Sequence, residues 1–198
     1  MRKEKIHFFR QIPRSILLIL FIVSAFVTLF ALRQNNTAMV RLRDEVYKAD
    51  KEGGDVNKAL NNLRSYVYGH MNTNLSSGGN SIKPPIQLKY TYERLQKVEQ
   101  ERVDTINSKV YTDAQNYCQA LNSVDFSGRN RVPCITEYVT SHGAKAQPIP
   151  AALYQFDFVS PTWSPDFAGW SLLITAVLLL AYAINLALDH IVGRPKDA

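Results

Sequence analysis

The sequence predicts a mainly α-helical protein in which two transmembrane helices flank an extracytoplasmic antiparallel helical bundle. Two uncharged apolar runs, at residues 16–32 and 170–188, each have about the length that a helix needs to cross a bilayer. Apolar residues between the runs recur at 3/4 spacing, which is typical of amphipathic helices. A chain of 198 residues with this pattern is not expected to be an ordinary soluble enzyme or a multi-pass transporter.

We expect five segments along the chain. Residues 1–15 form a basic cytoplasmic N-terminus, and residues 16–32 form the first transmembrane helix. Residues 33–165 form the extracytoplasmic helical domain. Residues 166–188 form an interfacial anchor with the second transmembrane helix, and residues 189–198 form a cytoplasmic tail that is too short to fold by itself.

The formal charge of +6 is concentrated ahead of the first apolar run, where five basic side chains accompany a single acidic one. Basic residues flank the cytoplasmic side of membrane spans, so we expect a two-pass protein of the cell membrane with both termini in the cytoplasm. Basic groups beside a span also attract anionic head groups, which makes membrane lipids expected partners. Nucleic acid is not expected, because no basic patch is interleaved with aromatic residues.

A cleaved signal peptide is the alternative interpretation of the first apolar run, because it has the same basic start and apolar core. Cleavage prefers small residues at two alternate positions. Residues 28–32, ahead of Arg33, offer no such pair, and the weaker candidate Ala25-Phe26-Val27 lies deep inside the run. We therefore expect an uncleaved anchor.

Helical spacing continues beyond the first apolar run, which predicts that its helix extends into the outer domain. Gly53-Gly54 is expected to end this helix, and Asp55 is a suitable N-cap for the next one. A second amphipathic helix follows over residues 56–71. The segment from Leu75 to Lys83 contains Ser, Gly and Asn, which indicates a turn or a flexible loop.

The longest periodic segment runs from Ile86 to Asn122 after a pair of prolines, and it predicts a third helix. Three segments with one apolar stripe each can bury those stripes only against one another, so we expect one antiparallel bundle. A shorter helix is expected over residues 132–141, beyond a turn at residues 122–133. The stripe expected to be buried on the third helix is Leu88, Leu95, Val103, Ile106 and Val110.

Prolines between residues 148 and 165 exclude long regular structure from the segment that returns to the membrane. Tyr154, Phe156 and Phe158 alternate with polar residues along this segment. Such alternation is typical of a short strand or of an extended segment that lies on an apolar surface. Packing of these rings on the bundle is the alternative interpretation.

Three large rings, Trp163, Phe167 and Trp170, cluster just before the second apolar run. Amphipathic rings favour the lipid head-group layer, so we expect these residues to anchor the second span at the membrane interface. The alternative is that the rings pack on the bundle.

The two cysteines, Cys118 and Cys134, both fall in the segment expected outside the cytoplasm, where the environment is oxidising. A disulfide between them would tie the Gly/Pro turn to the end of the third helix and would stabilise the fold by roughly 3 kcal/mol. A redox or metal pair is the alternative. Two thiols without CxxC spacing make a poor metal site, so we expect a structural disulfide.

The sequence contains no catalytic constellation that we can identify. Its four histidines show no HExxH spacing, and no GxSxG, Walker or dinucleotide fingerprint is present. Charges on the predicted helices alternate in sign at helical spacing, which is typical of a solvated face. We therefore expect no cofactor, no metal site and no enzymatic activity.

Short polar motifs inside and beside the apolar runs give weaker evidence about helix packing and about modification. Ser24 and Thr28 form a small-xxx-small step that allows close helix packing, as do Ala183 and Ala187. Asn185 is expected to bond another helix or to reach the interface. Two triplets, which begin at Asn35 and Asn74, match the acceptor pattern for N-glycosylation, although such triplets are common by chance.

The layout of span, outer helical bundle and span resembles the sensor half of bacterial receptors, but the tail contains no output module. The string RLRDEVYKAD after the first apolar run is similar to the LemA family. The strings RSYVYGHMNTNL and PPIQLKYTYERLQ resemble those of uncharacterised two-pass envelope proteins of reduced-genome candidate-phylum bacteria. This resemblance covers about a third of the chain, and it implies an envelope protein without naming a functional residue.

We expect a non-enzymatic membrane protein whose outer domain binds or scaffolds a partner protein or a second copy of the chain. The expected partner surface consists of Tyr90, Val98, Tyr154, Phe156 and Phe158, because a small core leaves apolar side chains uncovered. The alternative is a ligand-binding sensor subunit that acts through a membrane partner. A pocket lined by Tyr66, Tyr90, Tyr92 and Tyr111 would favour that alternative. A membrane-bound enzyme is the third hypothesis.

Overall fold

The computed structural model describes residues 13–76, 82–121 and 129–192, with side chains up to residue 188. This part of the chain is mainly helical, which confirms the predicted fold class at that level. Parts of four expected segments lie outside the described residues: most of the basic N-terminus, residues 77–81 of the loop, residues 122–128 of the turn and the end of the C-terminal tail.

The chain divides into two compact units. The first unit comprises Met1–Ile86 together with Asp157–Ala198, and the second comprises Gln87–Phe156. Each unit is described separately below.

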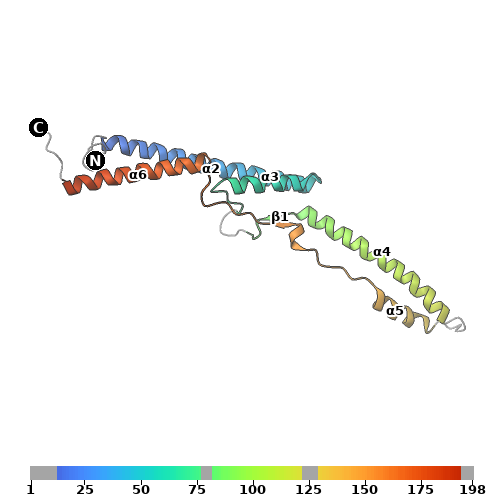
Figure 1. The fold of residues 1–198 in the computed structure, drawn as a ribbon. Coiled ribbons are helices and arrows are strands. Elements are labelled where there is room, and N and C mark those ends of the chain that lie inside the picture. Colours follow the sequence, from blue (N-terminus) through green and yellow to red (C-terminus); the bar gives the residue numbers. More distant parts are fainter. Residues whose placement is uncertain (1–12, 77–81, 122–128, 193–198) are drawn as a thin grey trace. The chain divides into compact units, whose positions relative to one another are not determined.

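The first unit is built on α2, a single helix from Arg14 to Glu52 that continues through the rise in polarity at Arg33 (Figure 1). This confirms that the helix of the first apolar run extends well beyond the run. Gly53 ends the helix with a left-handed backbone (φ 70°), and its N–H donates to the Ala49 carbonyl. Glycine adopts this conformation without a steric penalty, which explains why the helix ends where the sequence predicted.

A second helix of the first unit, α3 (Val56–Gly69), folds back beside the C-terminal part of α2. The Lys58 N–H donates to the Asp55 carboxylate at 2.9 Å, so Asp55 is the predicted N-cap. The apolar stripes of the two helices face each other. Their buried members are Met39 and Val46 on α2 and Leu60, Leu63 and Val67 on α3.

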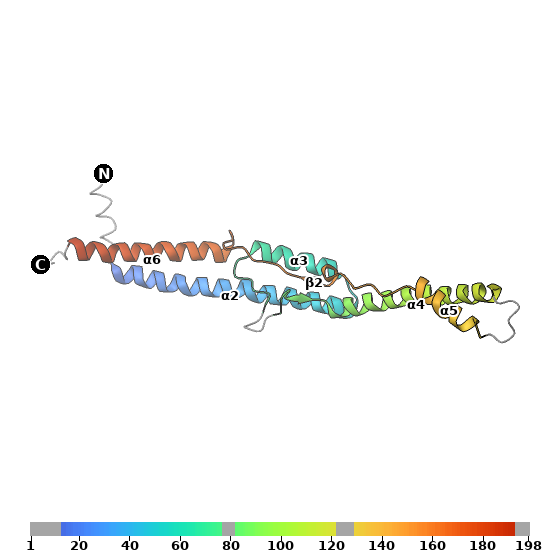
Figure 2. The same ribbon diagram turned by 90° about the horizontal axis from the view of Figure 1, so that it is seen from below.

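The third helix of the first unit, α6 (Phe167–Val192), lies alongside the N-terminal part of α2 in both views (Figures 1 and 2). Both α2 and α6 contain a window that is long and apolar enough to cross a membrane. Thr28, Ala31 and Asn35 are buried on α2 at steps of three and four residues. Such spacing forms the contact seam of a closely aligned helix pair.

The second unit contains α4 (Lys89–Leu121), which packs against the shorter α5 (Arg131–His142). The bounds of α5 agree to within a residue with the helix expected over residues 132–141. An extended segment follows α5 and leads to a single 3-10 turn, η1 (Ala151–Leu153).

Two very short strands, β1 (Ile86–Gln87) and β2 (Gln155–Phe156), form a two-stranded sheet. The pairing extends by one bond, in which the Leu88 N–H donates to the Tyr154 carbonyl at 2.8 Å. The expected extended structure of the aromatic return segment is therefore present at Gln155–Phe156, whereas Tyr154 lies in the turn before the strand.

The structure does not confirm the prediction that the three outer helical segments form one bundle. α2 and α3 belong to the first unit, whereas α4 belongs to the second and packs there against α5. α5 has 12 residues and cannot cover the 33 residues of α4. Of the predicted stripe, only Leu88 and Val103 are buried, whereas Leu95, Ile106 and Val110 are partly or largely exposed.

Candidate functional site

Hydroxyl groups of α2 and α6 meet in the seam between these two helices. The Ser24 Oγ lies 2.6 Å from the Thr175 Oγ1, and the Thr28 Oγ1 lies 2.9 Å from the same atom. Thr175 also donates to the Ser171 carbonyl one turn earlier in α6. The hydroxyls therefore find protein partners within the pair, and the Ser24–Thr28 step lies where the helices approach each other.

The polarity of this helix pair is inverted relative to a pair in a soluble protein. Asn185 is buried, and its Oδ1 accepts a hydrogen bond from the Arg14 Nε at 3.2 Å. Large apolar side chains are instead exposed, between Ile16 and Phe30 on α2 and between Leu172 and Leu186 on α6. Exposure of so much apolar surface is unfavourable in water and favourable among lipid chains.

A polar junction connects α2, the end of α3 and the start of α6, and it consists of Asn35, Met71, Ser164 and Asp166. The Asn35 amide donates to the Asp166 carboxylate at 2.8 Å and to the Met71 carbonyl at 3.2 Å. The Met71 N–H donates to the Ser164 hydroxyl at 3.0 Å, and this hydroxyl donates to Asp166 at 2.8 Å. Asn35 and Ser164 are buried, so each bond also satisfies a group that water does not reach.

Asp166 is both the centre of the junction and the N-cap of α6, because its carboxylate accepts a hydrogen bond from the Gly169 N–H at 2.8 Å. Burial raises the pKa of this carboxyl. The hydrogen bonds from Gly169, Ser164 and Asn35 lower the pKa by more, and the net pKa lies below the ordinary value. The ionised form of Asp166 is therefore the one that stabilises the junction.

We expect the stability of the first unit to depend on the ionisation of Asp166. Because its folded-state pKa is depressed, its contribution is fully present above the ordinary pKa of 3.8 and is lost as the pH falls through the lower folded-state value. Asp166→Ala should cost about 1 kcal/mol at pH 7, since it removes a helix cap. Unfolding in mild detergent at pH 7 and at pH 3 measures both effects.

Asp166→Asn is the matched variant for this experiment, because it keeps an oxygen acceptor and removes the charge. The acid-dependent loss of stability should be smaller in Asp166→Asn than in the unchanged chain. An equal loss in both proteins would mean that other carboxyls cause the acid dependence.

Trp163, Phe167 and Trp170 are all exposed at the start of α6. The two indole rings contact each other edge-on, with centroids 6.0 Å apart, and the Trp163 Nε1 donates to the Gly169 carbonyl at 3.2 Å. The rings thus lie beside the N-terminus of an apolar helix, as an interfacial anchor requires. Their contact with lipid stays a prediction.

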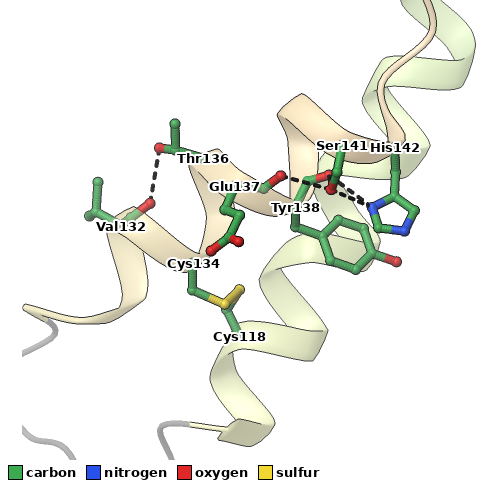
Figure 3. Close-up of a disulfide and its surroundings, with 8 residues drawn as sticks. All are labelled: Cys118, Val132, Cys134, Thr136, Glu137, Tyr138, Ser141 and His142. Atoms are coloured by element: carbon green, nitrogen blue, oxygen red, sulfur yellow. Dashed lines mark hydrogen bonds between the residues drawn. A yellow bond between two sulfur atoms is a disulfide. The ribbon is translucent and has the colours of Figure 1, made fainter.

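In the second unit, Cys118 of α4 and Cys134 of α5 form the predicted disulfide, with their Cα atoms 5.9 Å apart (Figure 3). Cys118 is fully buried. The bond joins the end of the long helix to the start of the short one. This arrangement is a structural cross-link and leaves no free thiol on either residue.

Near the disulfide, the Tyr138 ring stacks on His142 and contacts the Tyr117 ring at a tilt. The ring centroids of Tyr117 and Tyr138 lie 5.4 Å apart, and those of Tyr138 and His142 lie 4.3 Å apart. The His142 Nδ1 lies within hydrogen-bond distance of the Tyr138 carbonyl and the Ser141 hydroxyl (Figure 3). These rings, with Glu137, line an open hollow of about 460 Å³.

The extended segment after α5 is held to α4 by hydrogen bonds rather than by apolar packing. The Asn107 side chain donates to the Ala144 carbonyl at 3.2 Å and accepts from the Ala144 N–H at 2.7 Å. Nearer the N-terminus of α4, the Glu99 carboxylate accepts hydrogen bonds from the Arg102 guanidinium at 2.7 Å and from the Gln147 N–H at 2.7 Å. Hydrogen bonds from Arg102, and then from Gln147, lower the pKa of Glu99 to about 2.

Sequence reasoning missed these hydrogen bonds. The alternation of charges on the predicted helices indicated a solvated face and gave no partner for Glu99. Asn107 follows the buried Val103 by one turn and so lies on the inner face of α4. An amide side chain at such a position could have predicted a hydrogen bond to another segment, because a polar residue on a buried face needs a specific partner.

The residues of the expected partner surface do not form one continuous patch within a unit. Tyr90 and Val98 are exposed on α4, with exposed fractions of 36% and 63%. The Tyr154 ring is half-buried against Tyr92, with centroids 4.6 Å apart, and Phe156 lies in β2. Phe158 belongs to the other unit, where its ring contacts Tyr68 edge-on.

The tyrosines that would line a sensor pocket are also separated. Tyr66 belongs to the first unit, where its ring stacks on His70 with centroids 4.0 Å apart. Tyr90, Tyr92 and Tyr111 belong to the second unit, and Tyr111 is exposed. The four rings therefore do not line one pocket of a single unit.

Within residues 13–76, 82–121 and 129–188, no group of three or more His, Cys, Asp and Glu side chains could hold a metal ion. His70 and His142 lie in different units, and His7 and the side chain of His190 fall outside the described residues. A hollow of about 360 Å³ lies in the first unit between residues 72–76, Lys83 and residues 157–160. No family model, curated protein or solved structure matches the chain.

Proposed function

We propose that this protein is a two-pass membrane protein that uses its second unit, outside the cytoplasm, to bind a partner protein. In this proposal α2 and α6 form the membrane anchor. The hydrogen-bonded junction at Asp166 links the anchor to the outer part of the first unit.

The distribution of polar groups in the α2–α6 pair supports the membrane anchor. Ser24, Thr28, Thr175 and Asn185 have hydrogen-bond partners in the seam, whereas the large apolar residues are exposed. A lipid environment explains both observations, because unsatisfied polar groups are costly there and exposed apolar groups are not. The basic residues before α2 favour a cytoplasmic N-terminus, so that the segment between the spans lies outside.

The proposal of a protein partner rests on the exposed apolar residues of α4. This 33-residue helix buries only Val103, Ala114 and Cys118 within its own chain. Its exposed residues include Val98, Ile106, Tyr117 and Leu121. Its charged residues form exposed i,i+4 pairs such as Lys97–Glu101, which contribute little to stability by themselves. A partner that covers the apolar residues would supply the burial that the chain lacks.

A photo-crosslinking amino acid at position 98 tests this proposal in membranes of the native host. We expect a crosslinked protein product from position 98 and much less product from position 100, which is also exposed but lies on the opposite side of the helix. A product with twice the mass of the chain identifies a second copy as the partner, and any other mass identifies a different protein. Equal yields, or no product, at the two positions would contradict the proposal.

The substitution Val98→Glu distinguishes a loss of partner binding from a loss of folding. This substitution places a charge on the exposed face, so it should reduce crosslinking through a neighbouring position without lowering the melting temperature of the unit. Val103→Glu is the comparison, because Val103 is buried and a charge there should destabilise the unit by several kcal/mol.

A further inference from the structure

We propose that Asn74 accepts an N-linked oligosaccharide from a polyprenyl-diphosphate donor at the outer face of the membrane. Asn74 begins the triplet Asn74-Leu75-Ser76, which has the acceptor pattern, and its side chain is exposed. The inference rests on the proposed orientation of the chain, in which the segment between the spans lies outside the cytoplasm.

The geometry of the triplet leaves the amide nitrogen of Asn74 available. The Ser76 N–H and hydroxyl both donate to the Asn74 Oδ1, at 3.1 Å and 2.9 Å. The Asn74 Nδ2 makes no hydrogen bond with the described residues. Two hydrogen bonds to the amide oxygen make the amide protons more acidic, which favours loss of a proton when the nitrogen attacks a sugar.

The backbone around Asn74 is held so that the acceptor residues face outward. The Asn74 N–H donates to the Asn36 Oδ1 at 3.1 Å, and Arg43 donates to the Leu75 carbonyl at 2.8 Å. Leu75 itself is buried, which anchors the middle of the triplet. Asn74 and Ser76 also border the hollow of about 360 Å³, which leaves room for a first sugar ring.

The second acceptor triplet, which begins at Asn35, provides an internal contrast. The Asn35 Nδ2 donates to Met71 and Asp166 and is buried in the junction. The Thr37 hydroxyl donates to the Arg33 carbonyl within α2 and makes no hydrogen bond with Asn35. Burial and hydrogen bonding of its amide nitrogen therefore exclude Asn35 as an acceptor.

The reaction is a glycosyl transfer without a redox change. The Asn74 Nδ2 forms a bond to the anomeric carbon of the first sugar. The bond between that carbon and the diphosphate oxygen breaks, and polyprenyl diphosphate leaves with the electron pair. One Nδ2 proton passes to a base of the oligosaccharyltransferase.

The full chain can be tested in membranes that contain an oligosaccharyltransferase specific for Asn-x-Ser/Thr and its polyprenyl-linked oligosaccharide. We expect one glycan, whose release by an amidase leaves an aspartate at position 74 in the mass spectrum. Asn74→Gln and Ser76→Ala should abolish the glycan, and Ser76→Thr should retain it. The matched control Thr37→Ala destroys the Asn35 triplet without changing Asn35, and it should leave the glycan unchanged.

A second control reports which side of the membrane the segment occupies. The double substitution Asp157→Asn/Val159→Thr creates a new triplet at two exposed positions of the first unit. Modification of this triplet without modification at Asn74 would overturn the inference and leave the orientation intact. Modification at neither site would overturn both. A glycan that survives Ser76→Ala, or is lost in Thr37→Ala, would overturn the assignment to Asn74.

Discussion

Gly169→Ala is expected to destabilise the first unit by about 2–3 kcal/mol, which is typical of overpacking in a tightly packed site. A Cβ atom on Gly169 would overlap the Ser164 carbonyl oxygen and would come within 3.0 Å of the Trp163 Nε1. The turn cannot move away easily, because Ser164 also bonds to Met71 and Asp166. The measurement is the unfolding free energy in mild detergent, with hydrogen exchange at the Met71 amide as a local probe.

Gly69→Ala is the matched control for this prediction. Gly69 ends α3, and nothing lies within 4 Å of an added Cβ atom. Alanine has the higher helix propensity, so the variant should be unchanged or more stable by less than about 1 kcal/mol. Similar unfolding free energies for the two variants would show that the close approach at Gly169 does not limit stability.

Loss of the disulfide is the second prediction with a large effect. Replacing both Cys118 and Cys134 by serine should destabilise the second unit by about 3 kcal/mol, because the unfolded chain gains the conformational freedom of the loop between the cysteines. α5 has no buried residue that could hold it to α4 in place of the cross-link. Amide hydrogen exchange in α5 should therefore increase most.

A reductant provides the control, because it breaks the same bond without a substitution. It should lower the melting temperature of the unchanged chain to about that of the double-serine variant, and it should have no effect on the variant. Slow exchange in α5 after reduction would mean that hydrogen bonds such as Asn107–Ala144 hold the second unit together without the disulfide.

Features that depend on near neighbours in the chain could be predicted from the sequence. The end of α2 at Gly53, the Asp55 cap and the approximate bounds of α3, α4 and α5 all follow from spacing, caps and turn residues. The Cys118–Cys134 bond was also predictable, because only two cysteines are present and they flank a turn. The hydroxyl seam was anticipated in part, through the Ser24–Thr28 step.

The sequence by itself thus determined a mainly helical chain with two apolar helices and one cross-link. Only the tertiary structure decided that α4 packs against α5, since identical 3/4 stripes do not specify which stripe faces which. It also decided that Asn35 meets Asp166 across 131 positions, whereas Asn74 stays exposed. Local patterns carry no information about such pairs, because the free energy of a buried hydrogen bond depends on a partner that folding brings from elsewhere in the chain.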